Sequence, residues 1–328
     1  MTRYVALLIA VAAWVGSAAP AGAAQATITY GLVQAHPVTL PLLVARDKGM
    51  FGRHGVNLEV ILTGTSAAAT QALIGGSVHL IGPTGDASFA AQQKEPRIKH
   101  VVATAEGVMY SLLVVPEIKS IQELRGKIAG ATTTKTGDAF YLRGIMDHYG
   151  MKDAKDYTII VAGPVAARAQ AMLNRTVHFT ANAEPQVSFL TERGMMELVK
   201  GRDLPRYKEY LQMSVVGMQD WIRANEDAVA RFIRAWIEAI DYIYDPGNKA
   251  DVIRIIGETA KVSEKYAANA YRVYVQEMKM YPARGRLNLA AIRAVYENYA
   301  LLGDLKGPIP DPREFVELGP WEKATGRR

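Results

Sequence analysis

Polar and small residues gather where predicted strands give way to predicted helices. Six such segments are "QAHP" (34–37), "TGTSA" (63–67), "PTGD" (83–86), "TTTKTGD" (132–138), "GPVAAR" (163–168) and "NAEP" (182–185). In an open α/β sheet a ligand binds beyond the carboxyl ends of the strands, where such helices begin. A helix start offers free N–H groups and roughly half a positive charge, so it can hold an anionic group. We therefore predict a ligand site formed by Gln34, His36, Thr65, Ser66, Thr84, Gly85, Asp86, Thr134, Thr136, Gly137, Arg168, Asn182 and Glu184.

The charged residues of these segments restrict the ligand. Asp86, Asp138 and Glu184 stand in predicted first turns, where an acid is favourable but competes with a bound anion. One of them is therefore expected to meet an amine or a ring N–H of the ligand. Lys135 and Arg168 are candidates for the countercharge, with a solvent-exposed helix face as the alternative for Arg168.

The hydroxyl and aromatic residues nearby have structural alternatives. Thr65, Ser66 and Thr136 can cap helices, and a cap and a ligand contact can coexist. Phe140 and Tyr110 could stack on a ring of the ligand or pack in a core.

Motifs of catalysis and metal binding are missing from the sequence. It has no cysteine and no Gly-x-Ser-x-Gly, and its six histidines show neither His-x-x-x-His nor His-x-His spacing. The 38 lysines and arginines are scattered among 32 acids, without a basic stripe interleaved with aromatics. We therefore expect no enzyme, no metal, no cofactor and no nucleic-acid partner.

Strands and helices alternate along the chain and position these segments. Apolar β-branched runs predict strands at 26–32, 56–62 and 77–82, and again at 127–132, 157–163 and 175–182. Helical spacing and caps predict helices at 38–51, 63–76, 83–93, 133–150 and 164–174. The fold class is therefore α/β, with two lobes that each hold a mainly parallel sheet flanked by helices.

One decapeptide occurs twice in similar form. "QALIGGSVHL" (71–80) and "QAMLNRTVHF" (170–179) lie 99 residues apart and mark the same helix-to-strand corner in each lobe. Their shared His79 and His178 are expected to do one structural job, such as bonding a nearby backbone carbonyl. A role in ligand binding or pH sensing is the alternative.

Two further strands connect the lobes. The strands predicted near 109–116 and 210–218 leave and re-enter the first lobe, and so form a hinge. Lobe 1 is expected to comprise 24–112 and 215–328, and lobe 2 to comprise 113–214. The C-terminal helices, which follow Asn225 and span 263–281 and 288–302, are expected to pack against lobe 1.

The first 23 residues have the features of a secretory signal peptide. Arg3 precedes an apolar run that is shorter than the roughly twenty residues of a membrane helix, and small residues follow at Ala21 and Ala23. Without cysteine the chain can form no disulfide and carry no lipid on a cysteine. We expect a free periplasmic protein, a monomer.

Four longer stretches carry a family resemblance. They are "ARDKGMFGRHGVNLEV", "TGTSAAATQALIGGSVHLIGPTGDA", "SIQELRGKIAG" and "WIRANEDAVARFIRAWIEAIDYI". In this order they resemble the solute-binding proteins of ABC importers for nitrate, taurine and aliphatic sulfonates, whose fold also serves thiamine-pyrimidine precursor proteins. The chain departs from the family pattern at His79 and His178, where an acidic residue is usual.

The resemblance implies a function as well as a fold. It implies a type II-like periplasmic-binding-protein fold, an anionic or zwitterionic solute such as a sulfonate, taurine, nitrate or a carboxylate, and an inner-membrane ABC permease as partner. Three alternatives remain: a neutral aromatic or heterocyclic vitamin precursor as ligand, an enzyme like the pyrimidine synthases, and a ligand-loaded partner of a membrane sensor.

Overall fold

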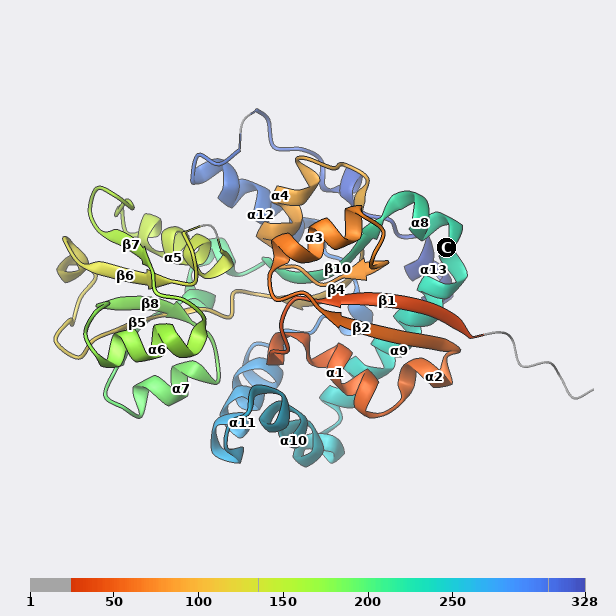
Figure 1. Cartoon of the computed structure of the whole chain (residues 1–328), viewed down its shortest axis with the longest axis horizontal. Helices are drawn as coiled ribbons and strands as arrows, with labels where there is room; N and C mark the ends of the chain where they lie inside the picture. The colour runs from red at the N-terminus through yellow and green to blue at the C-terminus, as the bar shows by residue number, and fades with distance from the viewer. Residues whose placement is uncertain (1–24, 135, 306, 328) are drawn as a thin grey trace, which may run out of the picture.

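The computed structural model describes residues 25–134, 136–305 and 307–327. The predicted signal peptide and Lys135 lie outside the described residues. Two five-stranded sheets form two lobes, which lie beside one another in Figure 1. The sheet of lobe 1 contains β1 (Ala26–Leu32), β2 (Val56–Leu62), β3 (Leu80–Ile81), β4 (Ile98–Glu106) and β10 (Leu211–Met218). The sheet of lobe 2 contains β5 (Ser111–Val114), β6 (Ile128–Ala131), β7 (Thr158–Val161), β8 (Phe179–Asn182) and β9 (Met196–Lys200).

Both sheets are mixed, and they share one strand order. The orders are β2-β1-β3-β10-β4 and β7-β6-β8-β5-β9. In each sheet four strands run in one direction, and the fourth position holds an antiparallel strand, β10 or β5. The expectation of mainly parallel sheets therefore holds for four strands of each sheet. Sequence reasoning missed β4, whose first eight residues are all buried and show no polar–apolar alternation. It also missed β9, which follows a helix at 186–191 that was not predicted.

The 99-residue offset extends through the register of both sheets. Tyr30 pairs with Leu80 in lobe 1, and Ala129 pairs with Phe179 in lobe 2, each 99 residues later. The helices α3 (Ser66–Ile74) and α6 (Val165–Leu173) keep the same offset. The repeated decapeptide therefore belongs to a duplicated βαβ unit.

Helices flank the sheets. Those of lobe 2 are α5 (Gly137–His148), α6 and α7 (Gln186–Thr191). Lobe 1 carries α1 (Leu40–Asp47), α2 (Met50–Arg53), α3, α4 (Gly85–Gln92), α8 (Gln219–Ala224), α9 (Glu226–Tyr244), α10 (Lys249–Ala260), α11 (Glu264–Tyr271), α12 (Leu289–Leu301) and α13 (Gly319–Thr325). No helix of the described residues is long and apolar enough to cross a membrane.

The helix α9 is the central support of lobe 1. Its apolar residues recur at helical spacing, so Phe232, Trp236 and Ile240 lie on one buried face. Glu226 and Asp227 in its first turn suit the positive end of the helix dipole. The helix packs against α1 and α13, as expected for a C-terminal element of this lobe.

The helix α12 differs from that expectation, because it joins both lobes. It packs on α4 and β10 of lobe 1. Its Ile292, Val295 and Tyr296 also share one apolar core with Leu113 and Ala129 of lobe 2. A periodicity pattern locates the buried face of such a helix but does not identify what covers that face.

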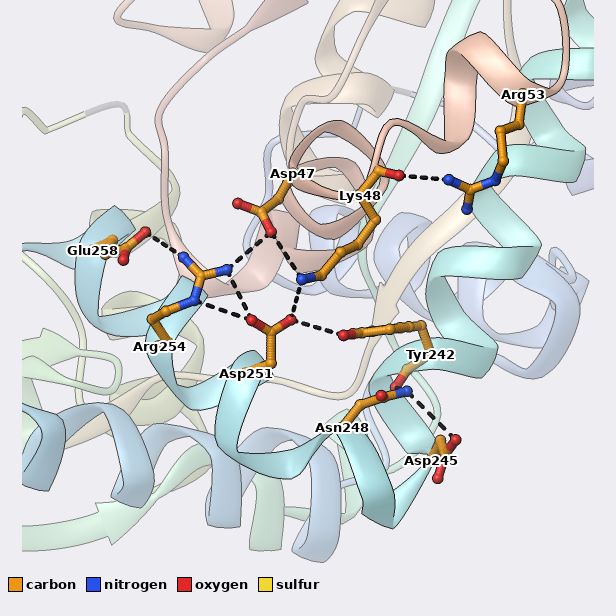
Figure 2. A network of polar contacts seen from close by, with 9 residues as sticks. All are labelled: Asp47, Lys48, Arg53, Tyr242, Asp245, Asn248, Asp251, Arg254 and Glu258. Carbon is orange, nitrogen blue, oxygen red and sulfur yellow. Dashed lines mark hydrogen bonds and ion pairs between the residues drawn. The ribbon is translucent and has the colours of Figure 1, made fainter.

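A polar network fixes the outer helices of lobe 1 (Figure 2). The Lys48 ammonium lies 2.6 Å from Asp251, and the Arg254 guanidinium lies 2.9 Å from Asp47. Partial burial raises the pKa of Asp251, but hydrogen bonds from Lys48, Tyr242 and Arg254 outweigh it and lower that pKa to about 2. These contacts tie α1, α9 and α10 together.

A surface groove of about 470 Å³ lies beside this network. Lys48, Arg53, Glu238 and Tyr242 contribute to its lining. Since the lining comes from α2, α9 and their neighbours in lobe 1, this groove is separate from the junction of the lobes.

Candidate functional site

The chain passes between the sheets at two adjacent segments. The Gly107 N–H donates to the Tyr210 carbonyl at 2.8 Å, and the Gly201 N–H donates to the Tyr110 carbonyl at 2.9 Å. A Cβ on Gly201 would lie 2.4 Å from that Tyr110 oxygen, so this close approach requires glycine. The segments near 107–110 and 201–210 therefore lie side by side where the two lobes join.

The starts of α4 and α5 face one another across this junction. A Cβ placed on Gly137 would lie 3.6 Å from the Thr84 hydroxyl oxygen and 3.7 Å from both carboxylate oxygens of Asp86. Thr84 and Asp86 belong to lobe 1, and Gly137 belongs to lobe 2. The structure therefore brings three of the predicted site residues together from opposite lobes.

Gly85 has a packing role of its own. A Cβ there would lie 2.1 Å from the carbonyl oxygen of Leu211 in β10. Glycine lets the start of α4 rest directly on β10, which positions Thr84 and Asp86 at the junction.

Asp86 is a buried carboxylate without an ion pair among the described residues. Its side chain belongs to a residue that is 5% exposed, and its Oδ1 has no hydrogen-bond partner. Burial raises the pKa of Asp86 to about 6; the Thr84 hydroxyl and the N–H groups of Asp86 and Ala87 act to lower it, and the charge of Asp138 acts to raise it. Among the residues that the structure describes, this carboxylate therefore has no positive partner of the kind that a buried charge normally has.

Arg168 is buried and paired, and the alternative of an exposed helix face is wrong. Its Nη1 donates to Asp138 at 2.6 Å and to the Thr132 hydroxyl at 2.7 Å. Its Nη2 donates to Asn182 Oδ1 at 3.3 Å. Asp138 matches the Arg168 charge, while the Nε of Arg168 and the Nδ2 of Asn182 have no partner in the described part of the chain. Both unpartnered groups are hydrogen-bond donors.

Tyrosines surround Asp86. Tyr110 and Tyr141 stack with ring centroids 4.9 Å apart, and the Tyr299 hydroxyl donates to the Asp86 carbonyl at 3.0 Å. Burial raises the pKa of Tyr141 and Tyr210, and the nearby Asp86 charge raises it further. The hydroxyls of Tyr141 and Tyr210 have no hydrogen-bond partner among the described residues.

Sequence reasoning identified Tyr110 but missed the other three tyrosines. One of them carried a signal, because Tyr141 follows Asp138 by three residues and so lies on the same face of α5. Tyr210 and Tyr299 lie far from Asp86 in the sequence, so no local pattern indicated that they are close to it. Phe140, the other aromatic candidate, lies 4.8 Å from Tyr299 between ring centroids.

Glu184 connects lobe 2 to α11. Its Oε2 accepts hydrogen bonds from the Ser188 hydroxyl at 2.7 Å and the Ser188 N–H at 3.2 Å. Its Oε1 accepts from Asn269 at 3.1 Å, and Tyr274 donates to its carbonyl at 2.9 Å. Burial raises the pKa of Glu184. Both carboxylate oxygens are thus engaged within the protein.

Two other predicted residues are caps. The Nδ1 of His36 accepts the Val38 N–H at 3.2 Å, where a short 3₁₀ turn begins. The Thr65 hydroxyl accepts the Ala68 N–H at 3.1 Å at the start of α3. Ser66 is the first residue of α3, and Gln34 is exposed after β1.

The loop before α5 closes on itself. The Thr136 hydroxyl accepts the Thr133 N–H at 3.0 Å and donates to the Thr133 carbonyl at 2.9 Å. The carbonyl of the exposed Thr134 accepts from Arg143 at 2.9 Å. These bonds set the conformation from which Gly137 faces lobe 1.

The two matching histidines do one structural job, but with the opposite bond polarity to that expected. The Nδ1 of His79 accepts the Thr29 N–H at 3.1 Å, and the Nδ1 of His178 accepts the Ile128 N–H at 3.2 Å. A backbone N–H, not a carbonyl, is the partner of each imidazole, because each histidine lies just after its helix, beside β1 in lobe 1 and β6 in lobe 2. Neither histidine lies among the grouped residues of the junction.

The described residues contain no group of three or more His, Asp or Glu placed to hold a metal ion.

Comparisons with known proteins agree with this architecture. A protein of Bordetella bronchiseptica RB50 has a TM-score of 0.79 and 19% identity, covering 92% of this chain and 97% of its own. The alkanesulfonate-binding protein SsuA from Xanthomonas axonopodis pv. citri, solved with MOPS bound, has a TM-score of 0.71 and 17% identity, over 89% and 99%. The periplasmic nitrate-binding protein NrtA from Synechocystis PCC 6803 has a TM-score of 0.74 and 15% identity, over 93% and 89%.

These likenesses identify the two-lobed, type II-like fold of periplasmic binding proteins. No curated protein sequence matches the chain. The model of the family described as NMT1/THI5 like matches residues 36–250, which is well over half of the 328 residues. The expected resemblance is thereby confirmed, and the chain belongs to the NMT1/THI5-like family.

Proposed function

We propose that this protein is the periplasmic solute-binding component of an ABC importer. It captures a small organic solute between its lobes and delivers it to an inner-membrane permease, as a monomer and without catalysis. The observation that carries the proposal is the meeting of the α4 and α5 starts, because Thr84 and Asp86 of lobe 1 face Gly137 of lobe 2. A solute that touches both lobes favours the closed form by its difference in affinity for the two forms.

The fold neighbours support the transport role. The proteins from Xanthomonas and Synechocystis are named for binding alkanesulfonates and nitrate, and they share the fold of this chain, which matches the NMT1/THI5-like family model. On this basis we propose a sulfonate, a taurine-like zwitterion, nitrate or a carboxylate as the solute class. The lobes would rotate about the crossing segments near 107–110 and 201–210.

A binding screen tests the proposal. Sulfonates, carboxylates, amino acids, nitrate and vitamin precursors are added to the mature protein, and a specific solute is expected to raise the melting temperature. The solute is then recovered and analysed by mass spectrometry. Recovery of a chemically altered compound would support the enzyme alternative and contradict a carrier role.

Substitutions test the placement of the site. Thr65→Phe and Thr136→Phe put a bulky ring at the starts of α3 and α5, and each should weaken solute binding by at least about tenfold. Thr158→Phe is the control, because Thr158 is exposed at the first residue of β7, at the opposite end of that strand from the site. Unchanged affinity in calorimetry for both site variants would refute this placement.

A further inference from the structure

The junction of the lobes has an unbalanced negative charge among the described residues. Asp138 and Arg168 neutralise one another across 2.6 Å. Asp86 and Glu184 are buried acids, and no described cationic side chain lies within hydrogen-bonding distance of either. A simple anion placed here would meet this surplus charge at short range and in a medium of low dielectric constant, where repulsion is strong.

Of the two acids, Asp86 is the one available to a ligand. Both oxygens of Glu184 accept hydrogen bonds from Ser188 and Asn269. The Oδ1 of Asp86 has no hydrogen-bond partner among the residues described, although Asp86 is only 5% exposed. The carboxylate faces the start of α5 in the opposite lobe, where a Cβ on Gly137 would lie 3.7 Å from both of its oxygens.

The surroundings of Asp86 suit a cation. Tyr110, Tyr141, Tyr210 and Tyr299 are close enough for the Asp86 charge to raise their pKa values. A carboxylate accepts strong, charge-assisted hydrogen bonds from an ammonium group. An ammonium ion would therefore supply the positive partner that Asp86 lacks.

We propose that the solute carries a positively charged nitrogen group and that Asp86 is the residue that selects it. This inference rests on the proposed solute-binding function. Of the solutes proposed there it keeps the zwitterions, and it adds organic cations. It excludes a plain sulfonate, nitrate or carboxylate as the preferred solute.

Paired compounds test the preference. Taurine, β-alanine and 1,4-diaminobutane are compared with isethionate, 3-hydroxypropionate and 1,4-butanediol, in which hydroxyl groups replace the amines. Calorimetry on the full mature chain is expected to find an amine that binds at least about tenfold more tightly than its hydroxyl counterpart. Asp86→Asn should abolish that preference. Hydroxyl compounds that bind as tightly as their amine partners would overturn the inference.

A second arm needs no ligand. An unpaired buried carboxylate destabilises the empty protein when it is ionised, so Asp86→Asn should raise the melting temperature at about pH 8 and by less at about pH 5. The charged and titratable groups near Asp86 are the Asp138–Arg168 pair and the four tyrosines named above. Burial raises the pKa of each of these tyrosines, so all four stay neutral at both pH values. The control is Asp220→Asn, which removes the same charge from an exposed position on α8. A lower melting temperature for Asp86→Asn at about pH 8 would show that the carboxylate is a structural partner, and would overturn the inference.

The binding comparison and the melting temperatures together distinguish failure of the Asp86 inference from failure of the proposed solute-binding role. If none of the six compounds binds but the melting temperatures change as expected, the assignment of Asp86 as an unpaired charge stands and the proposed solute-binding role loses support. If an anion binds and Asp86→Asn strengthens it, the solute-binding role stands and the cation preference is wrong.

Discussion

At the residue scale, the duplicated histidines illustrate what the sequence could and could not predict. Their matching positions predicted a shared structural job for His79 and His178, and the structure confirms that job. The partner was wrong, because a pattern of residue types does not specify whether an imidazole nitrogen donates or accepts. Arg168 gives a second example. Its position in a helix was predicted, but its burial was not, because it depends on a contact with Asp138, 30 residues earlier in the chain.

Replacing either histidine should destabilise the protein. His79→Ala leaves the Thr29 N–H without its acceptor and removes the ring that stacks on Trp221 at 4.5 Å. The loss should be about 1–3 kcal/mol in urea unfolding. Burial lowers the pKa of His79, so its contribution is present above its ordinary pKa and is lost as the pH falls toward the folded value.

His178→Ala should show a similar loss for the Ile128 N–H. His148→Ala serves as the control, since His148 is exposed at the end of α5. If His79→Ala and His178→Ala were as stable as His148→Ala, the proposed structural role of the two histidines would be contradicted.

Gly85 provides a second test at this scale. Gly85→Ala forces a methyl group against the Leu211 carbonyl, which lies 2.1 Å from the Cβ position, so the start of α4 must shift. The expected cost is about 1–3 kcal/mol, together with weaker solute binding. Gly52→Ala is the matched control, because its nearest neighbour would be 3.8 Å away and alanine is favourable in a helix. Thermal unfolding of both variants measures the difference.

At the element scale, local patterns predicted most strands but not the contacts between lobes. The predicted bounds of β1 and β2 agree with the structure, and β10 differs by one residue. The strand β4 was missed because its first eight residues are buried, which removes the alternation of polar and apolar residues that marks a half-buried strand. The docking of α11 on α7 joins segments about 80 residues apart and left no local signal.

That docking forms a contact between the lobes, which Figure 1 shows at the lower side of the junction. Asn269 of α11 donates to Glu184 at 3.1 Å and also contacts the Ser188 hydroxyl. Lys265 and Tyr266 of α11 both contact Glu192. Since α7 belongs to lobe 2, opening of the lobes must break these bonds.

Asn269→Ala should therefore favour the open form. The loss of about 1 kcal/mol of interlobe hydrogen bonding should weaken solute binding by about fivefold. Small-angle X-ray scattering should record a larger radius of gyration for the empty variant. Arg293→Ala, which removes only an exposed pair with Glu297 on α12, should leave both quantities unchanged. An unaltered scattering profile for Asn269→Ala would mean that this contact does not hold the lobes together.

At the scale of the whole molecule, the two lobes are copies of one unit joined by exchanged strands. The same strand order in both sheets, with β10 and β5 at equivalent positions, places the starts of α4 and α5 on opposite sides of one junction. The 99-residue repeat predicted this duplication. The closeness of Thr84 to Gly137 could not be predicted, because it depends on how the two lobes pack on one another, which no local pattern encodes.

This closeness makes closure measurable by crosslinking. The chain has no cysteine, so the double variant Thr84→Cys/Gly137→Cys contains a single possible disulfide. The Thr84 hydroxyl oxygen lies 3.6 Å from the Cβ position of Gly137, which a small adjustment brings to disulfide geometry. A saturating solute should speed bond formation by favouring the closed form, as followed by non-reducing gel electrophoresis. The single-cysteine variants control for bonds between molecules. If the double variant crosslinks at the same rate with and without a bound solute, the solute does not close the lobes, and the role of the junction as a clamp is refuted.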